Sequence, residues 1–502
     1  MTAPPQNPPG FSTYLAKDYA SFRALMLDHL TGELPELANL EVASVEMTLV
    51  EALAYVGDYL SQYQDAVGSE AYVQTARLWT SLSRHARLVG LRLSEGCSAR
   101  TLVRFEAAGD HVPVAKGTAL LAAQPGIDRV HLAKAAPFAG AIGFETLHDL
   151  TLQRAHNRIA LAPVSRPAPG FTGLTLDGHF PLLQPGHFLV LCEEDSGWRW
   201  PLRLIAPDCD PAGRSTITWH ELDALPADTP RQGTWCLLGN LALADHGLTL
   251  QDPQPIAHPA ANARPLLHCP DLSFAVPLGA GDATRSAAHL LAPDPLHALP
   301  ALWLDERIAP LAADVGAWPI AQWRARRDLL DAAPQDLAFV PERVDKHSYR
   351  LRFGDGHAGR RPQSDYEFHS SWRQGCGSAG NIGIDALAHV IAADGRIRSV
   401  GNPLPGSGGR DRPALSVARQ ALIAEAARCP QARCVTEADY ARHAARLHGV
   451  KASACRIVPR AGGRDVTITV QRDHGSAANI ASALEPYRLL GDRLAIEIGE
   501  EQ

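Results

Sequence analysis

The sequence has little lysine, few methionines and no long hydrophobic run. Only five of its 47 basic residues are lysine, and the 502 residues include three methionines and nine cysteines. No segment reaches the roughly 18 consecutive apolar residues of a transmembrane helix, so we expect no membrane span. The polar, proline-rich residues 1–10 contain no basic segment followed by an apolar core, which argues against a secretory signal.

Net charge and cysteine spacing exclude further classes of protein. A formal net charge of −7 argues against a dedicated nucleic-acid binder, because such proteins carry a basic excess. The cysteines are scattered and odd in number, which indicates a reduced, cytosolic setting with mostly buried thiols. Cys429 and Cys434 are the closest pair, but no pair of histidines accompanies them, so we expect no zinc site.

Positive charge is absent from residues 28–70, which contain nine acidic residues and no Lys or Arg. The next segment, 77–104, reverses this pattern with six Arg and one acid. Within the acidic segment, apolar residues recur in alternating steps of four and three, as in a heptad repeat. This pattern predicts a helix that packs along another helix of the chain or of a partner, and its residues are Leu49, Leu53, Val56, Leu60, Tyr63 and Val67.

The whole pattern predicts an α+β multidomain fold with an N-terminal helical region, a β-rich middle and a mixed α/β C-terminal region. We expect helices over about 17–30, 45–67 and 69–90, followed by short apolar runs broken by Pro and Gly. The predicted domains are an N-terminal helical bundle segment, a β-rich domain with irregular loops at 252–300, and an α+β domain. Their predicted ranges are 1–98, 99–337 and 338–502.

The C-terminal region has its own start and stop signals. Thr436 and Asp439 form a capping-box pattern that opens a helix. A hairpin is expected over 450–470 with its turn at Gly462 and Gly463, and a last helix from about Ala477 towards Leu490.

In the N-terminal region, three tyrosines spaced four apart favour core packing, and these are Tyr55, Tyr59 and Tyr63.

Motifs that could carry chemistry are explained more simply as turns. The glycine-rich segment 353–360 holds Asp355 and His357, but it lacks the ending of a P-loop and is expected to be a tight turn between strands. Cys376 has no obvious base nearby, and Asp245-His246 is expected in a turn rather than at a metal site. We therefore assign no catalytic, cofactor-binding or metal-binding residue and expect no cofactor.

A series of segments, in order along nearly the whole chain, resembles the baseplate J-like wedge family of contractile phage tails and extracellular contractile injection systems. Each segment by itself has only the pattern of a turn or a helix, and the resemblance rests on the order in which the segments occur. The segments are 18–22 (DYASF), 49–61 (LVEALAYVGDYLS), 84–90 (RHARLVG), 96–100 (GCSAR), 144–146 (FET), 155–157 (AHN), 239–240 (GN), 244–247 (ADHG), 351–356 (LRFGDG), 380–383 (GNIG), 402–405 (NPLP), 435–440 (VTEADY) and 484–489 (LEPYRL).

The resemblance implies a non-enzymatic, structural wedge subunit, with residues 338–502 as a baseplate J-like domain. In that family, wedge proteins form hetero-oligomers around a hub and spike, usually sixfold, and link to the sheath. The implied location is the bacterial cytoplasm during assembly and then the phage tail or injection particle. Neither nucleic acid nor a membrane is an expected partner.

Two other functions stay open from the residues alone. One is a particle-borne cell-wall or polysaccharide hydrolase, which would need two carboxylates facing a cleft. The other is a carbohydrate- or receptor-binding module in the β-rich region. For the structural function, the predicted interface combines an apolar seam with a basic face, and its residues are Leu49, Leu53, Val56, Leu60, Tyr63, Arg77, Arg84 and Arg87.

Overall fold

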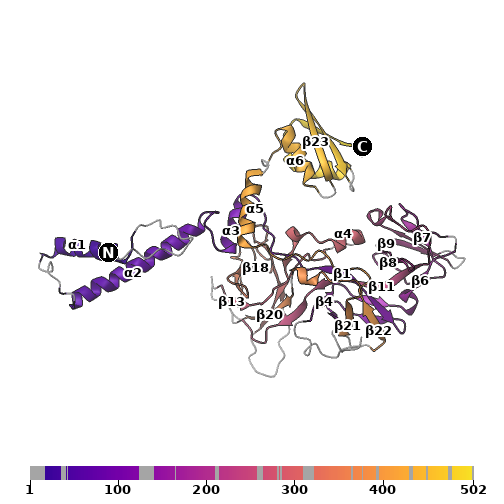
Figure 1. Cartoon of the computed structure of the whole chain (residues 1–502), viewed down its shortest axis with the longest axis horizontal. Helices are drawn as coiled ribbons and strands as arrows, with labels where there is room; N and C mark the ends of the chain where they lie inside the picture. Colours follow the sequence, from indigo (N-terminus) through magenta and orange to yellow (C-terminus); the bar gives the residue numbers. More distant parts are fainter. Residues whose placement is uncertain are drawn as a thin grey trace. The chain divides into compact units, whose positions relative to one another are not determined.

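The fold was described from a computed structural model (Figure 1). It describes residues 17–35, 41, 43–123, 141–163, 165–209, 214–256, 264–279, 282, 285–308, 321–362, 366–375, 377–391, 395–428, 433–447, 450–472 and 477–499. The chain divides into two compact units, and each is considered by itself. Residues 1–76, 84–91 and 416–502 form the first, and 77–83 and 92–415 form the second.

The first unit begins with a helical hairpin. Helix α1 (Tyr19–Glu33) starts at a capping box in which the Asp18 carboxylate accepts from the Ser21 backbone N–H. Helix α2 (Val45–Glu70) starts after Ser44, whose hydroxyl oxygen accepts from the Met47 backbone N–H at 3.1 Å. α2 therefore begins where the sequence predicts and continues three residues beyond the predicted end at Val67.

The third predicted helix begins later than expected. Residues 71–75 form turns, and α3 runs from Trp79 to Leu88 rather than from about residue 69. The physical reason is that α2 keeps its helical hydrogen bonds through Gly68, where a helix end was expected, so the break falls after Glu70. Leu82 and Ala86 on α3 are fully buried, as their one-sided pattern predicts.

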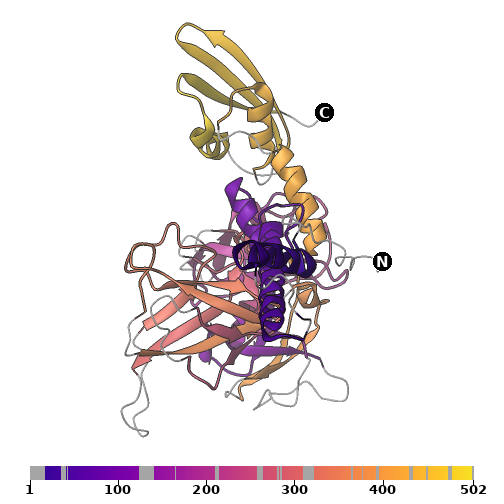
Figure 2. The same ribbon diagram turned by 90° about the vertical axis from the view of Figure 1, so that its left-hand side faces the viewer.

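The C-terminal part of the first unit is an α+β element (Figure 2). A three-stranded sheet has the order β23-β24-β25, with β23 antiparallel and β25 parallel to the central strand. Helices α6 and α7 pack on this sheet, and their apolar side chains form its core with Val466 and Ile468. The elements are α5 (Leu415–Arg428), α6 (Glu437–Ala445), β23 (Val450–Arg460), β24 (Gly463–Arg472), α7 (Ala477–Leu484) and β25 (Asp492–Ile498).

Two C-terminal predictions are confirmed and one is partly wrong. The Thr436–Asp439 capping box opens α6, and β23 and β24 form the predicted hairpin. The last helix ends at Leu484, six residues earlier than predicted, because Pro486 follows in a short 3-10 turn (Glu485–Tyr487). Strand β25 then closes the sheet, although the sequence analysis did not predict it.

The larger sheet of the second unit combines strands from distant parts of the sequence. Among the described residues it has 11 strands, and β22 pairs with β1 although nearly 300 residues separate Phe105 from its partner Val400. The path is β21 (Leu387–Ile391), β3 (Ala119–Ala122), β4 (Gly143–Thr146), β11 (Trp235–His246), β8 (Phe188–Glu193), β9 (Arg199–Cys209), β10 (Ser215–Trp219) and β7 (Gly173–Thr175), with β1 (Arg100–Ala107), β22 (Ile397–Gly401) and β6 (Ile159–Ala160) beside it.

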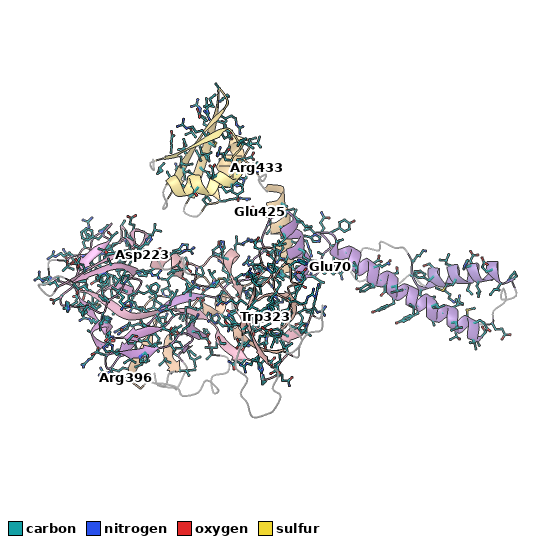
Figure 3. The ribbon with its side chains drawn as sticks, turned by 180° about the vertical axis from the view of Figure 1, so that it is seen from behind. Glu70, Asp223, Trp323, Arg396, Glu425 and Arg433 are labelled. Carbon is teal, nitrogen blue, oxygen red and sulfur yellow. The ribbon has the colours of Figure 1, made fainter. Side chains whose placement is uncertain are left out.

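A seven-stranded sheet lies in the same unit and is built around Trp323, which is fully buried (Figure 3). Its ring meets Phe353 and Phe368 edge-on at 5.5 and 5.6 Å between centroids. The strand order is β12 (Leu248–Gln251), β20 (Tyr366–Gln374), β16 (Leu302–Ile308), β17 (Ala321–Ala325), β18 (Ala338–Arg343), β19 (Ser348–Phe353) and β13 (Leu266–His268).

Short elements complete the second unit. The described part of 252–300, where irregular loops are predicted, contains only short pieces. Two small sheets and a one-turn helix are formed by β2 (Val112–Val114) with β5 (Leu150–Leu152), β14 (Phe274–Ala275) with β15 (Leu299–Pro300), and α4 (Ala287–Leu291).

These observations confirm the predicted α+β fold class with its helical N-terminal region and β-rich middle. The boundaries of the three predicted domains stay predictions. One local prediction is wrong: Asp245 and His246 do not form a turn but end the long strand β11, where Asp245 pairs with Arg100 of β1. The turn begins one residue later at Gly247, which has a positive φ of 117°.

Candidate assembly surface

The predicted apolar seam lies on one side of α2 and is exposed. Leu49, Leu53, Val56, Leu60 and Tyr63 keep between 50% and 63% of their surface accessible. Because steps of four and three return to the same side of a helix, these residues form one continuous stripe. Side chains stand out along the length of α2 in Figure 3.

The opposite face of α2 is occupied by α1. The Phe22 ring lies so close to Gly57 that a Cβ at that position would stand 3.0 Å from the ring. The Ser61 hydroxyl donates to the Lys17 carbonyl oxygen at 3.0 Å, and Ala54 is fully buried. Small residues thus let the two helices approach, and the larger apolar residues of α2 are left outside the hairpin.

The tyrosine ladder belongs to the exposed surface, so the prediction of core packing for it is wrong. Tyr55, Tyr59 and Tyr63 are 66%, 65% and 63% exposed. Spacing of four keeps residues near one another on a helix but does not determine which side is covered. Here α1 packs on the side that carries Ala54 and Ser61, so the tyrosines face away from it.

The helical hairpin that carries the stripe is acidic. Residues 28–70 contain no Lys or Arg, and Asp28, Glu33 and Glu46 are exposed. Arg23, just before this segment, pairs with Glu51 at 3.3 Å. A partner that covers the stripe would therefore meet an apolar stripe on a negatively charged hairpin, and basic residues on the partner would be complementary.

The three predicted basic residues do not share one helix. Arg84 and Arg87 are exposed on α3, whereas Arg77 precedes its first residue. Arg77 lines an open cavity of about 940 Å³ in the second unit, together with Trp79 and Glu95. The later start of α3 causes this separation.

The cavity beside Trp79 contains the partly buried carboxylate of Glu95. The Trp79 indole N–H donates to Glu95, and the Arg412 guanidinium lies 3.8 Å from the same carboxylate and 5.0 Å from the centre of the Trp79 ring. Burial raises the pKa of Glu95. Since both carboxylate oxygens contact protein groups, the arrangement ties the start of α3 to the segment around Arg412.

Asp355, in the glycine-rich segment 353–360, has a local structural role. Its carboxylate accepts from the backbone N–H groups of Ala358 and His357, both at 2.9 Å, and these bonds lower its pKa. A general acid in glycoside hydrolysis requires a raised pKa. The predicted turn is confirmed, because Gly356 and Gly359 have positive φ angles of 92° and 87°.

The other motifs of the resemblance hold loops and strands together. The Asn402 side chain donates to the Gly383 and Leu404 carbonyl oxygens and accepts from the Leu387 backbone N–H. Arg100 pairs in a bidentate manner with Asp245, at 2.5 and 3.0 Å, and both side chains are almost fully buried. Cys376 lies outside the described residues.

The described part of the chain contains neither a group of metal ligands nor a membrane-spanning helix. No cluster of three or more His, Cys, Asp or Glu side chains in the described ranges could hold a metal ion. Within the same part of the chain, no helix is long and apolar enough to cross a membrane.

The sequence analysis missed part of the exposed surface. Val45 at the start of α2 is 73% exposed, and Tyr55 and Tyr59 extend the apolar area beyond the heptad stripe. Val45 stands four residues before Leu49, so an extension of the same spacing by one step would have included it.

Comparison with known proteins identifies the region that carries this surface. Residues 18–88 match the family model of the bacteriophage baseplate protein N-terminal domain. The chain is therefore similar to baseplate proteins. This match covers α1, α2 and α3 and confirms the predicted resemblance at the level of a baseplate protein.

Comparisons over the whole chain give weaker likenesses. A chain from the cryo-EM structure of the anti-feeding prophage (AFP) baseplate is 12% identical, with 94% of this chain and 70% of that chain covered and a TM-score of 0.32. A chain of the type VI secretion system TssK-TssF-TssG baseplate subcomplex is 11% identical, with 90% and 96% covered and a TM-score of 0.36. With TM-scores this low, neither likeness supports a conclusion about this chain. No curated protein sequence matches the chain.

Proposed function

We propose that this chain is a structural wedge subunit of the baseplate of a contractile phage tail-like injection system. The main support is the exposed apolar stripe of α2, which lies within the segment that matches a baseplate domain. An apolar stripe of this length on one helix is typical of a surface that is covered in an assembly. The subunit would act by holding neighbours in position.

The stripe residues and the arginines divide this proposed interface into two parts. Leu53 and Leu60 represent the apolar part, which would pack against helices of another wedge subunit. Arg84 and Arg87 represent the basic part, which would meet acidic surfaces and influence partner choice and the rate of encounter. Arg77 would contribute from outside α3.

The proposed neighbours are other wedge subunits, the hub and spike, and the sheath, in a sixfold hetero-oligomer. The acidic character of residues 28–70 favours a different chain over a second copy at the stripe, because two acidic helices would repel each other. We propose assembly in the bacterial cytoplasm and final incorporation in the particle.

Affinity purification from the native cell tests this function. A tagged chain should bring down tube, sheath and hub proteins in fixed proportion, and purified particles should contain it at the baseplate end by electron microscopy. Particles that lack the chain, or a purification that brings down none of these proteins, would contradict the proposal. A cell-wall digestion assay on the same sample tests the hydrolase alternative, and cleavage that survives removal of contaminating enzymes would contradict a purely structural function.

A further inference from the structure

Cys192 and Cys236 stand directly opposite each other on neighbouring antiparallel strands. Cys192 belongs to β8 and Cys236 to β11, and the register pairs them between the pairs Leu191↔Leu237 and Glu193↔Trp235. Opposite residues of an antiparallel pair point to the same face of the sheet. Their Cα atoms are about 4.5–5.5 Å apart, which lies within the range of about 4.4–6.8 Å that a disulfide spans.

Both residues are free thiols in the core of the second unit. Only 6% of Cys192 and 3% of Cys236 is exposed, and they pack with Phe188 and Val190. The neighbouring thiol is the largest influence on the pKa of each cysteine. By contrast Cys455, which is partly buried, is opposite Ile468 in its sheet.

The pair lies one residue from the end of the paired ladder, next to an exposed ion pair. Arg158 and Glu194 lie 2.7 Å apart at that end, with 55% and 40% of their side chains exposed. The Glu194 carboxylate acts on the Cys236 thiol and raises its pKa. A small polar oxidant can therefore approach Cys236 from this side, although the thiols are covered from the bulk solvent.

We propose that Cys192 and Cys236 form a peroxide-sensitive dithiol that closes to a disulfide between β8 and β11. This proposal does not depend on the baseplate function. The Cys236 thiolate attacks hydrogen peroxide, which gives a sulfenic acid on Cys236 and releases hydroxide. The Cys192 sulfur then attacks the Cys236 sulfur, and the hydroxyl group leaves as water. In total, two thiols and one peroxide give one disulfide and two waters.

The order of these steps follows from the surroundings of the thiols. The neighbouring Cys192 thiol lowers the pKa of Cys236 and outweighs burial and the Glu194 carboxylate, which act in the opposite direction. The neighbouring Cys236 thiol and burial both raise the pKa of Cys192. The thiolate is the reactive form, so Cys236 reacts first and Cys192 resolves the intermediate. The disulfide would close residues 193–235, which include β9 and β10, into a covalent loop and restrict unfolding of this part of the sheet.

Peptide mapping of the full chain tests the proposal. Purified, reduced protein would be treated with a small excess of hydrogen peroxide, quenched, unfolded in the presence of an alkylating reagent and digested without reduction. We expect a cross-linked peptide that joins Cys192 to Cys236, at least a tenfold loss of their alkylation, and a melting temperature higher by several degrees. A thiol reductant should reverse all three changes.

Two variants separate this pairing from general oxidation. Cys192→Ala should remove the cross-link and the thermal shift and leave an oxidised Cys236, whereas Cys269→Ala, which changes another buried thiol, should behave like the natural chain. The proposal is overturned if both cysteines stay fully alkylated after peroxide treatment. It is equally overturned if Cys236 of the natural chain becomes sulfinic acid without a cross-link.

Discussion

Replacing Leu53 and Leu60 together by aspartate should block assembly without unfolding the chain. The two leucines are 57% and 54% exposed, so the lone chain has already left about half of each side chain in water. Full burial of a leucine side chain contributes about 1.5–3 kcal/mol. Covering the remaining halves would therefore contribute roughly 1.5–3 kcal/mol in total, equal to about 10- to 150-fold in affinity.

The expected loss of binding free energy exceeds this apolar contribution. Two carboxylates would have to leave water in an apolar contact, and burial of an unpaired charge costs several kcal/mol more. In the lone chain the same substitutions change only helix propensity, by about 1 kcal/mol together. Binding to wedge partners should thus fall by well over 100-fold, while thermal unfolding measured by circular dichroism changes little.

Gln62→Asp is the matched control. Gln62 is exposed on α2 but lies about 140° around the helix from the centre of the stripe, so Gln62→Asp adds one of the two negative charges of the double variant away from the stripe. The measurements are co-purification with the particle proteins and electron microscopy of particles. Normal particles with Leu53→Asp and Leu60→Asp combined would refute the interface, and equal loss with Gln62→Asp would show that charge alone, rather than the stripe, is responsible.

Three further predictions concern the fold. Asp245→Ala leaves a buried arginine without its carboxylate, so it should cost about 3–5 kcal/mol in denaturant unfolding, whereas Arg460→Ala, at an exposed ion pair, should cost less than about 1 kcal/mol. Two hydrogen bonds from the Arg464 guanidinium lower the pKa of Asp492 below its ordinary value of 3.8. The carboxylate therefore contributes fully to folding stability above pH 3.8, and this contribution is lost as the pH falls further. Asp492→Asn should make the folding stability depend less on pH in this acidic range. Gly354→Ala would place a Cβ 2.3 Å from backbone atoms and should lower the melting temperature markedly, while Gly383→Ala, with open space around it, should change it little.

Elements with a strong local signal are predicted correctly from the sequence. The Thr436–Asp439 capping box, the Gly462–Gly463 hairpin turn and the Asp355 turn all form as predicted, because hydrogen bonds between near neighbours or positive φ angles decide them. The predicted end of α2 at Gly68 was wrong, since a glycine permits a helix end but does not require one when the next residues can continue the helical hydrogen bonds.

The heptad stripe of α2, the acidic charge of residues 28–70 and the lack of a strong catalytic motif can all be predicted from the sequence alone. These properties depend only on residue spacing and residue type. They predict that α2 has an apolar side, but they do not determine what covers that side.

Which faces are covered, and which distant strands pair, depends instead on contacts between segments that are far apart in the chain. Contact between Gly57 and Phe22 turns one side of α2 towards α1 and leaves the tyrosines exposed. The pairing of β22 with β1, and of Cys192 with Cys236, joins segments whose local patterns carry no information about each other. Register between distant strands comes from the burial of a whole sheet face, which no short segment determines alone.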